Sequence, residues 1–157
     1  MLLITIFIPI SFYYLLKTIG KVDTMMVSEL SQRKIPLIIQ AFLIFTLIQK
    51  SITLDRIPEL FFFFFGGLLS TLLTLIFLFR KVKASIHMTG ISSLTAFVVG
   101  LSLQNQINFM CYIVFLILMN GVIASSRLEM KAHTNIELGI GFLVGLIPQI
   151  VLFYFWL

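Results

Sequence analysis

Hydrophobic residues along this chain form long uninterrupted runs, and charged residues are confined to the short segments between them. A transmembrane helix needs about 20 apolar residues. One run is 43 residues long, about twice that length, and Gln104 to Asn108 in its middle predict a turn that divides it into two spans. The pattern therefore predicts six helices. The runs without Asp, Glu, Lys or Arg cover residues 1–16, 35–49, 60–79, 84–126 and 138–157.

The first two predicted spans are shorter than the others. The second, Ile35 to Gln49, reaches Leu54 if the Lys50 side chain extends toward the membrane surface. The first, Met1 to Leu16, could instead be a signal peptide. It lacks a positively charged start and a cleavage site of small residues, which favours a retained helix.

Composition supports an integral membrane protein. Hydrophobic residues make up 60% of the chain, charged residues 11%, and the mean hydropathy is +1.13, whereas a soluble domain has roughly 25% charged residues. We therefore expect an all-α fold, an integral membrane six-helix bundle, with residues 1–157 forming a single transmembrane domain. The net charge of +5 does not indicate nucleic-acid binding, because the basic residues cluster at the ends of the spans. The single cysteine, Cys111, cannot form a disulfide within the chain.

Six spans would place three connecting segments, 17–34, 80–87 and 125–137, on one face of the membrane. This face would carry nine of the eleven Lys and Arg residues and both histidines. The asymmetry has two explanations, which both stay open. Cytoplasmic loops are enriched in Lys and Arg, and a phosphate site needs cations wherever it lies.

Two polar segments on this predicted face contain nearly all the groups capable of chemistry. Segment 126–137 contains Arg127, His133 and Glu137, a spacing that suggests phosphate chemistry at a membrane surface. Glu137 lies four residues after His133, so on a helix the two side chains share a face. The simpler interpretation is that Thr134-x-x-Glu137 is a capping box that opens the last helix. The second segment contains Lys83, Ser85 and His87.

These segments resemble the signatures of the type 2 phosphatidic acid phosphatase and vanadium haloperoxidase superfamily, in its membrane lipid phosphatase branch. Ser126-Arg127-x5-His133-x3-Glu137 is similar to the third signature, Ser-Arg-x5-His-x3-Asp, with Glu in the last position. Ala84-Ser85-Ile86-His87 resembles the second, Pro-Ser-Gly-His, without its Pro and Gly. The first, Lys-x6-Arg-Pro, is degraded: Arg33 is followed by Pro36, and Met26 stands at the lysine position.

The resemblance implies roles for these residues. His133 would attack phosphorus and form a phosphohistidine, Glu137 would orient its ring, and His87 would protonate the leaving oxygen as general acid. The other site residues would bind the phosphate. They are Arg127, Arg33, Lys83, which could replace the missing lysine, and Ser85.

Two functions remain open from the sequence. One is an enzyme, a phosphoric monoester or diphosphate hydrolase that acts on a lipid phosphate in the bilayer. The other is a catalytically weak relative that binds phospholipid or serves as a structural subunit of a membrane complex. With either function, the chain could also form a homo-oligomer. We expect no cofactor, since two histidines without a cysteine cluster give no zinc signature. Apart from Pro148, mid-span positions are expected to be apolar, which argues against a transporter.

The resemblance also bears on localisation. It implies a bacterial inner membrane protein, and bacterial members of the family commonly work on the periplasmic face. The distribution of Lys and Arg instead places the polar face in the cytoplasm. The side that the site faces is therefore left open.

Overall fold

A computed structural model of the chain describes residues 18, 30–50, 52 and 57–157, and every regular element in this part is a helix. Four helices, α3 to α6, are long and apolar enough to cross a membrane. The prediction of an all-α protein is confirmed for these residues, and the four apolar helices are consistent with an integral membrane protein. The predicted first span, Met1 to Leu16, lies outside the described residues. The helices are α2 (Leu30–Lys50), α3 (Pro58–Phe79), α4 (Ile86–Asn105), α5 (Met110–Glu129) and α6 (Asn135–Trp156).

The helix ends follow local sequence signals. Pro58 opens α3, where its missing N–H has no helical partner to lose. The predicted turn in the 43-residue run is confirmed, since α4 ends at Asn105 and Gln106 adopts a left-handed conformation with φ 52°. The last helix opens with the predicted capping box, in which Thr134 is the N-cap residue and Glu137 is the third helical residue.

Two helices extend beyond the predicted spans at the end that carries the candidate site. α2 begins at Leu30, so Arg33 lies within the helix instead of before it, and Pro36, already inside the predicted span, also lies within the helix. α5 continues to Glu129, which places Arg127 in its last turn. Arg127 is therefore held on a helix, whereas the sequence suggested a connecting segment.

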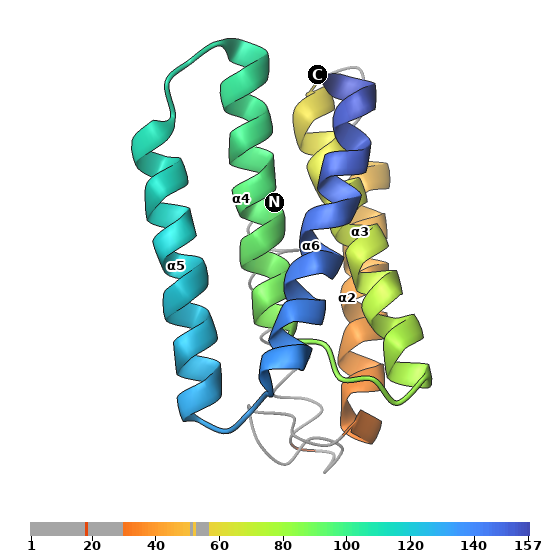
Figure 1. Cartoon of the computed structure of the whole chain (residues 1–157). Helices are drawn as coiled ribbons and strands as arrows, with labels where there is room; N and C mark the ends of the chain where they lie inside the picture. Colours follow the sequence, from red (N-terminus) through yellow and green to blue (C-terminus); the bar gives the residue numbers. More distant parts are fainter. Residues whose placement is uncertain (1–17, 19–29, 51, 53–56) are drawn as a thin grey trace.

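Successive helices run in opposite directions, so the α3–α4 and α5–α6 connections lie at the same end of the bundle (Figure 1). α6 packs against both α3 and α4, α2 packs against α3, and α5 packs against α4. The start of α2 also lies at this end (Figure 1). The fold thus brings together the three chain segments in which the candidate site residues occur.

The α4–α6 interface is close because small residues face it. A Cβ atom at Gly141 would lie 2.6 Å from the carbonyl oxygen of Ser85, and one at Gly145 would collide with Ser92 and Thr89. Thr89 Oγ1 donates a hydrogen bond to the Gly141 carbonyl at 3.0 Å, one of the contacts that link the two helices. Small residues and hydroxyl groups hold transmembrane helices together in this way. The start of α6 is consequently fixed against the start of α4.

The expectation that mid-span positions are apolar is wrong. Gln149 of α6 is completely buried, and its Nε2 donates to the carbonyl oxygen of Phe63 in α3 at 3.0 Å. Ser70, Thr71 and Thr74 of α3 are also buried. Thr71 and Thr74 hydroxyls donate to the carbonyl oxygens four residues earlier, at 2.8 Å each. Such local bonds satisfy a hydroxyl without water, so the two threonines fit within an apolar bundle.

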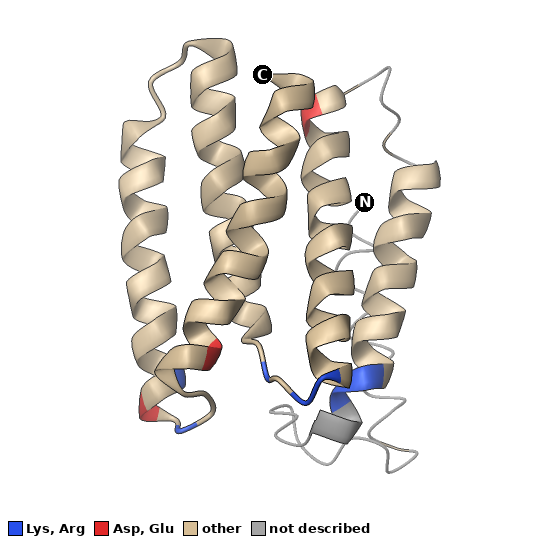
Figure 2. Cartoon of the chain, turned by 45° about the vertical axis from the view of Figure 1, so that its right-hand side comes forward, with Lys and Arg blue, Asp and Glu red and all other residues tan. Residues whose placement is uncertain are grey.

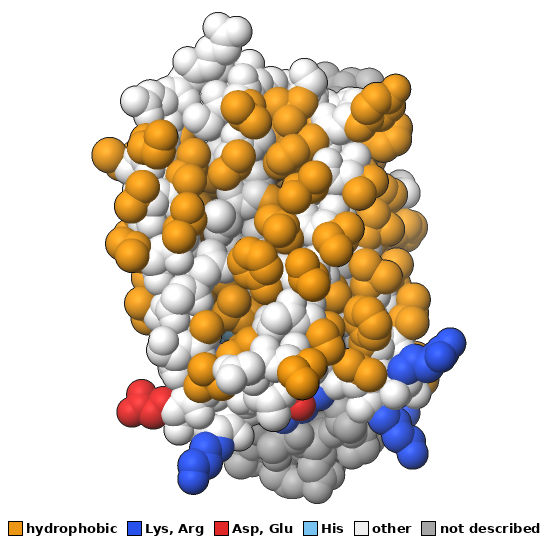
Figure 3. Space-filling view, in the orientation of Figure 1, with side chains coloured by type: hydrophobic (Ala, Val, Ile, Leu, Met, Phe, Trp, Pro, Cys, Tyr) orange, Lys and Arg blue, Asp and Glu red, His pale blue; other side chains and the backbone are white. Residues whose placement is uncertain are grey.

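Charge is distributed unevenly along the bundle axis. Figure 2 shows basic residues gathered around one end of the helices, and Figure 3 shows hydrophobic side chains covering the surface above that end. Of the eight described Lys and Arg residues, Lys50, at the far end of α2, is the exception. The seven at the basic end are Arg33, Lys34, Arg80, Lys81, Lys83, Arg127 and Lys131.

Candidate functional site

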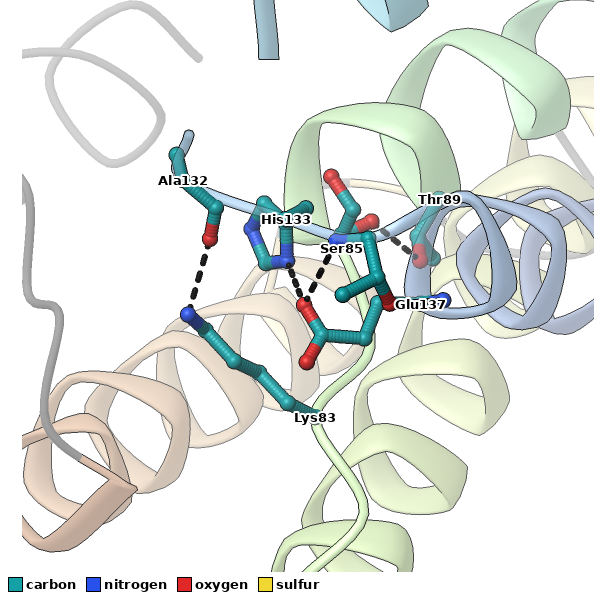
Figure 4. Close-up of polar contacts among 7 residues, drawn as sticks. Lys83, Ser85, Thr89, Ala132, His133 and Glu137 are labelled. Carbon is teal, nitrogen blue, oxygen red and sulfur yellow. Dashed lines mark hydrogen bonds and ion pairs between the residues drawn. The ribbon is translucent and has the colours of Figure 1, made fainter. Parts of the chain in front are cut away.

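The clearest contact at the basic end joins His133 and Glu137. His133 Nδ1 lies 2.9 Å from Glu137 Oε2, and the His133 side chain is only 5% exposed (Figure 4). His133 precedes α6, so the pairing depends on the bend of the chain at the N-cap and not on a shared helical face. An ionised carboxylate can only accept, so Nδ1 is the protonated nitrogen in neutral His133. Its Nε2 then keeps a lone pair.

Glu137 serves this contact and the helix cap together. Its Oε2 also accepts from the Thr134 backbone N–H at 3.3 Å, and its own backbone N–H donates to Thr134 Oγ1 at 3.3 Å. The catalytic and capping interpretations therefore do not exclude each other. The capping box holds the carboxylate in the position from which it contacts His133.

The environment of His133 favours its neutral form. Burial lowers the pKa of His133, the hydrogen bond to Glu137 acts in the opposite direction, and the positive charges of Arg33 and Lys83 lower it further. The result is a pKa below the ordinary value of 6.5. At neutral pH the imidazole is uncharged, as a nitrogen nucleophile must be.

Lys83 ties the α3–α4 connection to the segment that carries His133. Its Nζ donates a 2.8 Å hydrogen bond to the carbonyl oxygen of Ala132, the residue before His133 (Figure 4). The backbone N–H of Ser85 donates to the Glu137 carbonyl oxygen at 3.2 Å. These two hydrogen bonds lie on either side of the His133–Glu137 pair and fix its place against the start of α4. An ammonium has three N–H donors, so Lys83 keeps donors beyond the one that Ala132 accepts.

The backbone of Ser85 packs against Gly141 of α6. The residue is 0% exposed, and its Oγ has no hydrogen-bond partner among the described residues. The predicted contact of this hydroxyl with a phosphate stays a prediction. What the geometry establishes for Ser85 is close packing against Gly141 and the backbone bond to Glu137.

Two arginines, Arg33 and Arg127, interact electrostatically with other candidate site residues. Arg33 interacts electrostatically with Glu137 and with both histidines. Arg127 acts in the same way on His87, which is exposed on the first turn of α4. Arg127 Nε is buried and has no hydrogen-bond partner in the described part of the chain. Within that part, the two histidines share Arg33 as a neighbour and make no direct contact.

Some features of this site could not have been found from the sequence. The partner of Lys83 is a backbone carbonyl, and a carbonyl carries no residue-specific signal. The spacing of Gly141 and Gly145 predicts helix packing, but it does not identify the residue that Gly141 contacts, which is the backbone of Ser85. Among the described residues no cluster of His, Cys, Asp and Glu could hold a metal ion.

Comparison of the chain with protein-family models, curated proteins and solved structures finds no significant match.

Proposed function

We propose that this chain is an integral membrane phosphatase that hydrolyses a lipid phosphate or diphosphate. The observation that carries the proposal is the His133–Glu137 pair, with its 2.9 Å contact at the basic end of the bundle. The low pKa of His133 supports a neutral nucleophile. The apolar surface above the site supports a substrate that resides in the bilayer (Figure 3).

In the proposed first step, His133 Nε2 attacks phosphorus and the bond between phosphorus and the lipid oxygen breaks. His87 gives a proton to the leaving oxygen, so the lipid departs as a neutral alcohol. For a diphosphate the leaving group is the lipid monophosphate. Glu137 stabilises the positive charge that develops on the ring of His133.

In the second step, water attacks the phosphohistidine and the bond between phosphorus and nitrogen breaks. His87, now neutral, takes a proton from the water, and inorganic phosphate leaves. Arg33, Arg127 and Lys83 supply positive charge for the phosphate oxygens through both steps. Arg127 Nε, which is buried and has no hydrogen-bond partner among the residues that the structure describes, supports a role as anion donor. The Ser85 hydroxyl is fully buried, so its donation to phosphate requires a rearrangement of the residues around it.

A second candidate is a non-catalytic protein that binds phospholipid or forms part of a membrane complex. One observation favours it: Lys83, the cation expected to replace the missing lysine, already donates to the Ala132 carbonyl. The capping role of Glu137 likewise requires no catalysis. In this case the basic end would bind anionic head groups without turnover.

Phosphate release distinguishes the two. We would measure it from purified phosphatidate, a prenyl diphosphate and a lipid A phosphate, with the wild-type protein and His133→Ala. Glu129→Gln, which removes an exposed charge from the end of α5 that leads to the same connection, is the matched control. The proposal predicts turnover by the wild type and the control and background release by His133→Ala. No turnover of any of these lipids by folded wild-type protein would favour the second candidate.

A further inference from the structure

A cavity of about 160 Å³ lies between α2, α3 and α4, and two of its lining residues, Thr89 and Ser93 of α4, also donate hydrogen bonds to α6. Its lining on α3 extends from Phe63 to Thr74, and its lining on α4 covers the first two turns, from Ile86 to Ser93. Ile86 lies between Ser85 and His87 in the chain, so one end of the cavity adjoins the basic end of the bundle. The cavity then continues toward the middle of the membrane-spanning region.

The cavity lining is less polar than its residue types suggest. Thr71, Thr74 and Thr89 donate their hydroxyl hydrogens to backbone carbonyls, and Ser93 donates to the Gly145 carbonyl oxygen at 2.9 Å. Ser70 Oγ is the lining hydroxyl without a partner among the described residues. Gln40 of α2, an exposed residue, adds an amide to the lining. The other lining residues are Leu, Ile, Phe and Gly, so most of the cavity suits hydrocarbon better than water, which needs two to four polar partners when buried.

Two glycines leave the cavity open. A Cβ atom built on Gly67 of α3 or Gly90 of α4 would have no atom within 4 Å, although both residues line the cavity. By contrast, a Cβ atom on Gly66, the neighbour of Gly67, would lie 2.5 Å from Gln149 Nε2. α3 is thus packed tightly against α6 at Gly66 and leaves space on the cavity side at Gly67.

We infer that this cavity binds the hydrocarbon segment next to the head group of an anionic lipid, whose phosphate lies among Arg33, Lys83 and Arg127. The cationic groups at one end and the apolar lining beyond them complement the two parts of such a lipid. An apolar cavity of about 150 Å³ holds a molecule of benzene, so this one takes a slender segment of about six carbon atoms and excludes a helix. Hydrolysis of the bound lipid rests on the proposed function. Binding of the lipid chain in the cavity does not.

Photolabelling tests the binding directly. The probe is a phosphatidate that carries a diazirine in its acyl chain near the glycerol, incorporated into phosphatidylcholine nanodiscs with the full-length protein. Labelled peptides should map to residues 37–44, 63–74 and 86–93 in the wild type. Gly67→Leu fills the cavity from α3 and should reduce this labelling about tenfold. Gly121→Leu is the matched control, because Gly121 also has open space around it but lies on the exposed face of α5.

A phosphatidylcholine probe with the same diazirine chain tests the head group, and weaker labelling than with phosphatidate is expected. Equal labelling by the two probes would overturn the link to the cationic groups. Labelling confined to other helices, or unchanged in Gly67→Leu, would overturn the cavity assignment. If Gly67→Leu does not fold, Gly90→Leu fills the same space from α4.

Hydrolysis gives a second measurement. Gly67→Leu should lower kcat/KM for a long-chain phosphatidate about tenfold and leave release from a soluble short-chain phosphate unchanged. Equal losses on both substrates would contradict the inference. Absence of turnover by the wild type would count against the proposed function alone, and the photolabelling result would still decide whether the cavity binds the lipid chain.

Discussion

The two ends of the helical bundle differ in how their connecting segments are held. At the basic end, Lys83 and Ser85 of the α3–α4 connection make hydrogen bonds to Ala132 and Glu137, about 50 residues away in the chain. At the opposite end, the bonds of the α4–α5 turn are local. Ser102 Oγ donates to the Ile107 carbonyl oxygen at 2.8 Å, a separation of five residues.

This difference separates two explanations for the basic charge. Charges that only set membrane orientation need no fixed partners, because the excess of Lys and Arg near the span ends decides the orientation. At the basic end, however, Lys83 is bound to the segment before His133, and Glu137 is held by a cap. Fixed groups of this kind are what a binding or catalytic site requires. The comparison therefore favours a site over topology alone.

The largest expected effect at the basic end, after loss of His133 itself, comes from Glu137→Gln. Gln at the third helical position still completes a capping box, so stability should change by no more than about 1 kcal/mol. The negative charge beside His133 is lost, and kcat should fall roughly a hundredfold to ten-thousandfold. Thermal unfolding and phosphate release measured on the same preparation separate the two roles. A parallel collapse of stability would show that Glu137 acts through the cap.

The same variant makes a prediction about pH. The contact with Glu137 raises the pKa of His133 against the larger effect of burial, so Glu137→Gln should lower this pKa further. The pKa of His133 in the folded protein lies below its value of about 6.5 in the unfolded chain. His133 therefore favours the folded state above about pH 6.5, and this stabilisation is lost as the pH falls through the folded pKa. NMR titration of labelled His133 should show the shift to lower pH. A shift to higher pH would contradict the assigned contact.

His87→Ala should have a smaller effect that depends on the leaving group. A general acid contributes about a hundredfold or more when the leaving group is a poor one. Hydrolysis of a phosphatidate should therefore fall by about that factor, and hydrolysis of an activated aryl phosphate should fall far less. Equal losses on both substrates would count against His87 as the general acid.

Lys83→Met should weaken phosphate binding about tenfold, the usual cost of losing a hydrogen bond to a charged group. The ammonium and its bond to the Ala132 carbonyl disappear together. Lys83→Arg keeps the charge and should restore most of the binding. Lys81→Met removes an exposed charge from the same connection and is the control. Phosphate competition against lipid hydrolysis measures the effect, and equal weakening by Lys81→Met would indicate a general electrostatic contribution.

The smallest effects are expected at the opposite end. Glu59→Gln and Asn105→Ala lie far from the basic end, in the first turn of α3 and the last turn of α4. Surface changes of this kind alter stability by about 0.5 kcal/mol or less, and hydrolysis should stay within about twofold of the wild type. A tenfold loss of hydrolysis in either variant would break the distinction between the two ends.

Much of the fold was predictable because hydrophobic runs report directly on membrane-spanning helices. The turn at Gln104 to Asn108 and the capping box at Thr134 were found for the same reason: polar residues interrupt or begin an apolar run. Buried Gln149 was missed because one amide in an apolar run does not reveal its partner, the Phe63 carbonyl oxygen. The 2.9 Å pairing of His133 with Glu137 matches the spacing argument, although the chain achieves it through the N-cap bend. The catalytic roles of these residues stay predictions.

The most direct test of the central claim is a search for phosphate on His133. Wild-type protein is mixed with a long-chain phosphatidate, quenched during turnover under conditions that preserve phosphohistidine, and digested for mass spectrometry. The account predicts a phosphorylated peptide in which His133 carries the phosphate, absent from His133→Ala and more abundant when breakdown of the intermediate is slowed. Turnover of the lipid by His133→Ala, or phosphate found on another residue, would contradict it.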